Sequence, residues 1–159
     1  MAHHHGHQHH EEEQLLLRQQ AIWQWRSAMQ AEYERLYPIP LPDLAAEVMA
    51  RGFGPGGRGY DDDAITVGGG SLTAGLTAND ISEQFIPEFE FGWEERQGED
   101  HNLREQIVKL VAEALQMLEH ASLVRCQYHH GMSAFDWAAT RYGRAMLDQG
   151  QVQAVLRGR

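Results

Sequence analysis

The chain has 159 residues and a net charge of −10, from 13 basic and 23 acidic side chains, and 42% of its residues are hydrophobic. This length fits one domain with an appendage, and the hydrophobic share is enough for a core. It contains no apolar run of about 18 residues, which argues against a transmembrane helix, and its start lacks the apolar region of a secretory signal. We therefore expect a cytoplasmic protein. The single cysteine, Cys126, excludes an internal disulfide and a cysteine-based zinc site.

The negative charge is unevenly distributed. Residues 1–100 carry six cations and eighteen acids, for a charge of −12, whereas residues 101–159 carry seven cations and five acids, for +2. Because total charge hides this distribution, it does not exclude nucleic-acid binding by the C-terminal part.

The N-terminal ten residues are rich in histidine. Such tracts bind divalent metals loosely through their imidazole nitrogens. We interpret residues 1–10 as a tag or a disordered start, and we assign no metal site there.

Residues 11–37 are predicted to form one long helix. Apolar residues recur at helical spacings and form a stripe of Leu15, Ile22, Trp25, Met29, Tyr33 and Leu36. Leu16 and Trp23 flank this stripe. This stripe packs either on the chain's own core or on a second copy. In the second case the candidate dimer interface consists of Trp25, Met29, Tyr33 and Leu36.

Alternate prolines then end this helix, and a short helix is predicted over residues 41–51, with Pro42 in its first turn and Gly52 as its stop. Residues 52–76 hold nine glycines, and a stretch of this length is either mobile or functional. A short strand is predicted at residues 64–67. The segment contains a literal G-x-G-x-x-G pattern, but a dinucleotide site needs a strand before it, so we reject that interpretation.

Residues 77–85 are predicted to form a short helix in which Thr77 and Asp80 make a capping box, and Pro87 ends it. Residues 88–100 are acidic, with Phe89, Phe91 and Trp93 alternating with polar residues. This pattern fits a strand or an ordered acidic loop equally well.

The best-defined helix is predicted over residues 103–121, with Asn102 as its cap. Its apolar face is formed by Leu103, Ile107, Leu110, Val111, Ala114, Leu118 and Ala121. A hairpin follows, with strands at 123–128 and 135–139. Thr140 caps a last helix over residues 141–149 with Gly150 as its stop, and an apolar tail ends the chain. The fold class is therefore mainly α with a small β-hairpin (α+β).

Two patterns in this region resemble the winged helix-turn-helix family. A helix runs through a small-residue turn into Leu123-Val124-Arg125, and the second strand leads into Thr140-Arg141-Tyr142-Gly143-Arg144. The resemblance covers about residues 103–150. Residues 41–51 and 77–86 would supply the two preceding helices, and residues 52–76 and 87–101 would be insertions in a winged-helix domain spanning 38–159.

This resemblance implies a DNA-binding transcriptional regulator, with the third helix in the major groove and the wing near the phosphate backbone. The candidate DNA contacts are Asn102, Arg104, Gln106, Lys109, Arg125, His129, His130 and Arg141.

The local charge favours an alternative. Helical geometry centres the solvent face of residues 103–121 on Glu105, Lys109, Ala112 and Gln116, with two further glutamates beside it, and the wing tip has no arginine or lysine. Since phosphate contacts dominate DNA affinity, this face favours a protein-interaction module instead. In that role the acidic segment 88–100 would dock a basic partner or mimic DNA.

No set of a nucleophile and a base is apparent, so we expect a non-catalytic protein without a cofactor. The neighbours His129 and His130 would point to opposite faces of the hairpin, which argues against a shared zinc ion. We interpret Cys126 as a buried structural cysteine.

Overall fold

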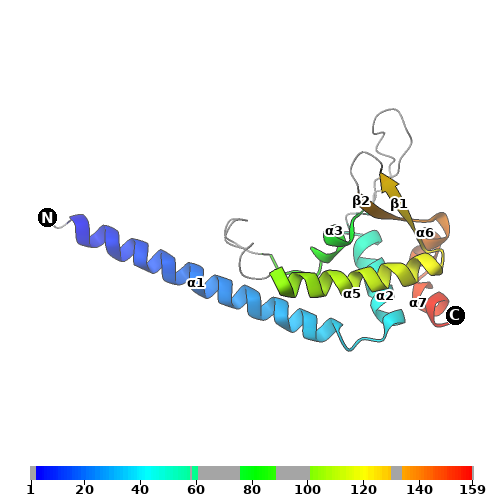
Figure 1. The fold of residues 1–159 in the computed structure, drawn as a ribbon, viewed down its shortest axis with the longest axis horizontal. Helices are drawn as coiled ribbons and strands as arrows, with labels where there is room; N and C mark the ends of the chain where they lie inside the picture. The colour runs from blue at the N-terminus through cyan, green and yellow to red at the C-terminus, as the bar shows by residue number, and fades with distance from the viewer. Residues whose placement is uncertain (1–2, 58, 61–75, 89–100, 130–133, 159) are drawn as a thin grey trace.

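The computed structural model describes residues 3–57, 59–60, 76–88, 101–129 and 134–158. The protein is mainly helical with one small antiparallel sheet of two strands, which confirms the predicted α+β class (Figure 1). Several predicted features lie outside the described residues: the strand at 64–67, the alternating aromatic residues of the acidic segment, and the tip of the hairpin.

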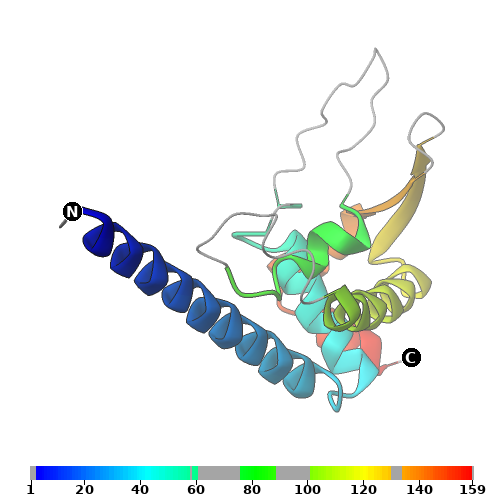
Figure 2. The ribbon, with the colours of Figure 1, turned by 60° about the vertical axis from the view of Figure 1, so that its left-hand side comes forward.

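The long N-terminal helix, α1 (His3–Leu36), begins inside the histidine-rich tract, where we expected a tag or a disordered start. It ends just before Pro38, as the proline pattern predicts. Its N-terminal half extends away from the rest of the molecule, and its C-terminal half lies against α5 (Figures 1 and 2).

The apolar stripe of α1 packs on the chain's own core. Trp25, Met29 and Leu36 are buried, and Tyr33 packs half-buried against the same core. The indole Nε1 of Trp25 also donates a hydrogen bond to the carbonyl oxygen of Pro87. Of the two alternatives left open by the sequence, the structure shows this stripe on the chain's own core, so three of the four candidate interface residues are buried within the chain and Tyr33 is half-buried.

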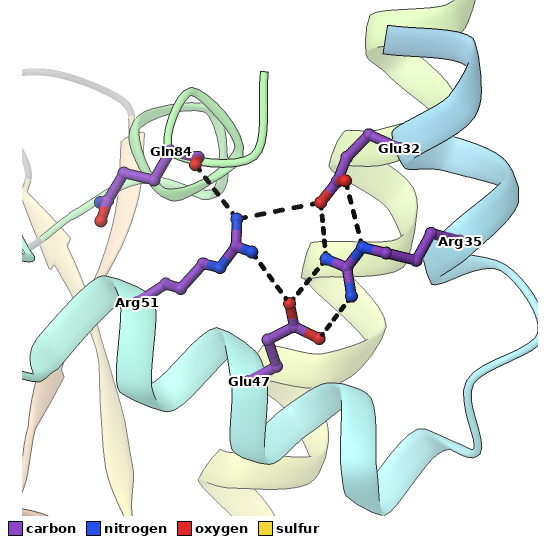
Figure 3. Close-up of polar contacts among 5 residues, drawn as sticks. All are labelled: Glu32, Arg35, Glu47, Arg51 and Gln84. Carbon is purple, nitrogen blue, oxygen red and sulfur yellow. Dashed lines mark hydrogen bonds and ion pairs between the residues drawn. The ribbon is translucent and has the colours of Figure 1, made fainter. Parts of the chain in front are cut away.

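Four charged side chains fix the C-terminal end of α1 to the second helix, α2 (Leu41–Phe53). The guanidinium group of Arg35 lies between two carboxylates, with Nη2 at 2.6 Å from both Glu32 Oε1 and Glu47 Oε1 (Figure 3). Arg51 joins the same group, with Nη2 at 3.2 Å from Glu47 Oε1. A network of this kind restrains the direction of α1 more than one exposed ion pair would.

α2 forms the centre of the core and contains Pro42 in its first turn, as predicted. It continues one residue beyond Gly52, the predicted stop, and Gly54 is its C-cap. Gly52 faces Ile81, and a Cβ built on it would lie 3.5 Å from Ile81 Cγ2, which is an ordinary van der Waals contact, so the packing of α2 on α3 does not require a glycine here.

The short helix α3 (Ala78–Ser82) begins with the predicted capping box. The Asp80 amide donates to Thr77 Oγ1 and the Thr77 amide donates to Asp80 Oδ2, both at 3.1 Å. The helix is shorter than predicted, because turns replace it from residue 83. The predicted core positions Ile81 and Phe85 are buried.

The next helix, α5 (His101–His120), packs against α1, α2 and α3. Its predicted apolar face is confirmed, with Leu103 and Leu110 half-buried and the remaining members buried. Asn102 lies within the first turn rather than at the cap, because the helix begins at His101.

The hairpin consists of β1 (Val124–His129) and β2 (Ala134–Ala139), paired from Val124↔Ala139 to His129↔Ala134. Leu76 adds an isolated antiparallel bridge to the outer side of β2. The Leu76 amide donates a hydrogen bond to the Trp137 carbonyl and the Trp137 amide donates one to the Leu76 carbonyl, both at 2.8 Å. This pairing joins the segment before α3 to the hairpin, and the sequence did not predict it.

The C-terminal part begins with α6 (Arg141–Asp148), which is capped by Thr140 as predicted. Gly150 then has a positive φ of 66°, in agreement with its predicted role as a stop. The expected apolar tail is a further helix, α7 (Val152–Arg157), which buries Val152 and Leu156 next to α2.

Candidate nucleic-acid interface

The exposed face of α5 is the surface that a winged-helix protein would present to DNA. Asn102, Gln106 and Lys109 are exposed, as the candidate list requires. Ala112, predicted near the centre of this face, is half-buried. The other exposed side chains of α5 include three acids and one amide: Glu105, Glu113, Glu119 and Gln116.

The charge of this face is therefore negative. Among the exposed side chains of α5 whose placement the structure describes, Lys109 is the permanent cation, against three carboxylates. A surface of this sign repels phosphate unless cations from other elements surround it.

Arg104 does not belong to the exposed face. It forms an ion pair with Glu83, which directly follows α3, and its side chain keeps 23% of its full exposure. The pair connects α5 to the residue that follows α3. Because both side chains are partly buried, replacing one of them would leave the other charge without its partner. Arg104 thus supports the site from its side and is not displayed at its centre.

A shallow open hollow of about 440 Å³ lies between α3 and the first half of α5. It is lined by Asn79, Arg104, Glu105, Val108 and Lys109. Asn79 is exposed and is not among the candidate residues predicted from the sequence. The capping box could have identified it, because a residue between Thr77 and Asp80 must lie at the open N-terminus of α3.

The remaining candidate cations lie elsewhere. Arg125 is the second residue of β1 and Arg141 is the first of α6, and both are exposed. Arg125 comes three residues after Ser122, and Arg141 directly follows Thr140. Because Thr140 Oγ1 donates a 2.6 Å hydrogen bond to the Ser122 carbonyl, which lies just after α5, both arginines lie near the C-terminal end of α5. Figure 1 shows the hairpin and α6 at the opposite end of α5 from its N-terminus.

The candidate residues thus form two groups and not one surface. Asn102, Gln106 and Lys109 occupy the first half of α5, and the two arginines lie at the base of the hairpin. His129 ends β1, but neither its side chain nor His130 falls within the described part of the structure.

Cys126 is half-buried on β1, opposite Trp137 of β2. Burial raises the pKa of its thiol, and the negative charges of Glu119 and Asp136 raise it further. At neutral pH the sulfur is therefore a thiol and a poor nucleophile. The prediction of a buried cysteine is met only in part, because Cys126 is half-buried.

Within the described ranges, no three His, Cys, Asp or Glu side chains are grouped so that they could hold a metal ion. In that same part of the chain, none of the helices combines the length and the apolar character needed to cross a membrane.

No family model matches the chain, and neither the curated proteins nor the solved structures include a match to it.

Proposed function

We propose that residues 38–159 form a winged-helix domain and that the protein is a non-catalytic DNA-binding regulator. The observation that carries this proposal is the pairing of Leu76 with Trp137. It joins the segment before α3 to the hairpin, so that α2, α3, α5 and the hairpin form one unit in the order that the sequence resemblance implies.

In this proposal α5 reads base edges from the major groove. The amides of Asn102 and Gln106 match the donor and acceptor pattern of adenine. Lys109 contacts a phosphate, and the hollow beside Asn79 admits the edge of the backbone. Arg125 and Arg141 supply phosphate contacts at the base of the hairpin.

The negative charge of the α5 face favours a second candidate function, docking of a protein partner. Three exposed carboxylates around one lysine attract a basic protein surface and repel a nucleic acid. The acidic segment 88–100 would add to the same attraction.

The first experiment measures binding of the full chain to duplex DNA over a series of salt concentrations. The affinity of a DNA-binding regulator falls steeply as the salt concentration rises. Lys109→Gln reduces the slope of log affinity against log salt concentration by about one. The matched control is Arg157→Gln, which removes an exposed cation of α7 far from this face and leaves the slope unchanged.

The glutamates separate the two candidates. Glu105→Gln and Glu113→Gln each strengthen DNA binding if phosphates approach this face, because each substitution removes a repulsive charge. If the full chain does not bind DNA even at low salt, the first proposal is wrong, and protein docking becomes the function to test.

A further inference from the structure

The N-terminal half of α1 carries an apolar surface that no other described part of the chain covers. Of the eight large hydrophobic side chains that are exposed in the described part of the protein, three lie here and a fourth lies about one turn further along the helix: Leu15 at 56%, Leu16 at 64%, Leu17 at 59% and Trp23 at 69%. Residues 8–20 are exposed without interruption. In Figures 1 and 2 this half of α1 extends beyond the other elements from both directions of view.

An isolated helix of this kind needs a partner. Most helical stability in proteins comes from packing of an apolar face, and an apolar patch on a projecting element is typical of an interaction site. The opposite end of α1 is already fixed by Trp25 and by the ion pairs of Arg35, so the projecting half is held ready for contact.

Most of these side chains share one face of the helix. At about 100° per residue, Leu15, Leu16, Ile22 and Trp23 surround Gln19, at the spacings of three, four and seven that helix pairs use. Leu17 points roughly 160° away from Gln19 on the same geometry. The face also adjoins the buried stripe, because half-buried Ile22 leads into Trp25 and Met29.

We propose that this face binds the same face of a second copy of the chain, with the two helices antiparallel and Gln19 at the two-fold axis. In this register Leu15 lies opposite the partner's Trp23, and Leu16 lies opposite the partner's Ile22. The contact is self-complementary, as a two-fold dimer requires. It is distinct from the stripe of Trp25, Met29, Tyr33 and Leu36, which the chain covers itself, and it does not depend on the proposed function.

Charge selects the antiparallel orientation. Glu11, Glu12 and Glu13 lie in the projecting half of α1 with Arg18 after them, and Arg26 lies in the other half of the helix. The antiparallel register brings Glu12 next to the partner's Arg26 on the same face as the apolar residues. A parallel pair would place Glu12 beside Glu12 and Arg26 beside Arg26, which like-charge repulsion disfavours.

The experiment measures the oligomeric state of the full chain by sedimentation over a range of concentrations. We expect a dimer for the parent chain and a monomer for Leu16→Glu and for Trp23→Glu. Each substitution occurs twice in a symmetric dimer, and losing one buried large side chain costs roughly tenfold in affinity, so the dissociation constant rises about a hundredfold.

The matched control is Leu17→Glu, which changes an equally exposed leucine of the same helix on the opposite side. It leaves the dimer intact. Circular dichroism confirms that each variant keeps its helix content, so that loss of the dimer is separated from loss of the fold.

A charge exchange tests the orientation. Glu12→Arg and Arg26→Glu each weaken the dimer, and the double variant restores it, because the exchanged charges still face each other. A parent chain that stays monomeric at all concentrations overturns the proposal. So does a Leu17→Glu variant that dissociates as readily as Leu16→Glu, or a double exchange that fails to restore association.

Discussion

Trp25 and Pro87 are 62 positions apart in the sequence, yet the Trp25 indole nitrogen lies 2.7 Å from the Pro87 carbonyl oxygen. Trp25 is 4% exposed and Pro87 is half-buried, so this hydrogen bond is partly shielded from water. It connects α1 to the segment that follows α3, on the opposite side of the core from the hairpin.

Trp25→Phe should therefore destabilise the fold by about 1–3 kcal/mol, because it leaves the Pro87 carbonyl without its donor. Trp25→Ala should cost about 3–5 kcal/mol, since it also empties the space that the indole ring fills. Urea unfolding followed by circular dichroism measures both values. Tyr142→Phe, at an exposed position of α6, is the control and should change stability by no more than about 0.5 kcal/mol.

Gly143→Ala should be severely destabilising, by more than about 3 kcal/mol. A Cβ at this buried position would overlap the carbonyl oxygen of Leu123 and meet the methyl group of Met49. The glycine thus allows α6 to pack directly on the start of the hairpin. Gly6→Ala is the control, because a Cβ there meets nothing within 4 Å, and alanine in the helix should be neutral or stabilising. Equal thermal shifts for the two variants would contradict this explanation.

Thr140→Val should cost about 1–2 kcal/mol, although valine has nearly the same shape. The hydroxyl accepts a 2.9 Å hydrogen bond from the Gly143 amide and donates one of 2.6 Å to the Ser122 carbonyl. Valine removes both bonds at once. Thr140→Ser retains the hydroxyl and should keep most of the stability in a denaturant titration, whereas a loss equal to that of valine would indicate a packing effect.

The stability of the protein should depend on pH through Glu32. A hydrogen bond from Arg35 lowers the pKa of this carboxyl below its ordinary value of 4.5, and burial opposes that shift only in part. Because the folded pKa is the lower one, the stabilising contribution is fully present above the ordinary value and is lost as the pH falls through the folded value.

The difference in unfolding free energy between the parent chain and Glu32→Gln should therefore shrink as the pH falls below that value. Acid unfolding curves at several pH values test this expectation. Glu34→Gln, at an exposed position on the same helix, is the control. A difference that stays constant from neutral to acid pH would show that Glu32 acts through packing and not through its charge.

Local signals account for most of what the sequence predicted. The capping boxes and caps at Thr77 and Thr140 and the apolar face of α5 depend on neighbours within one or two helical turns, and periodicity detects these. The same reasoning identified the stripe of α1 but left its partner open, because a pattern defines a face and not what covers it.

The long-range contacts were not predictable in this way. Leu76 pairs with Trp137 through its backbone, and a single paired residue has no periodicity. The sequence makes Arg104 a candidate DNA contact, and nothing in the spacing of α5 predicts that Glu83 lies beside it. The candidate site was therefore only partly predicted, and Asn79 was missing from it.

The described residues on either side of positions 61–75 lie close together. Arg144 donates hydrogen bonds to the carbonyls of Phe53 and Gly59, and its guanidinium lies 5.4 Å from the centre of the Tyr60 ring. A Cβ built on Gly59 would lie 3.1 Å from Leu76 Cδ1, so the residues on either side of 61–75 are direct neighbours.

Both ends of this segment are thus anchored independently of what lies between them. Loop closure depends only weakly on length, at about 0.6 kcal/mol for each doubling. The position between Tyr60 and Leu76 is consequently a natural insertion point, where evolution or an engineer can exchange one peptide for another of different length without altering the architecture around it.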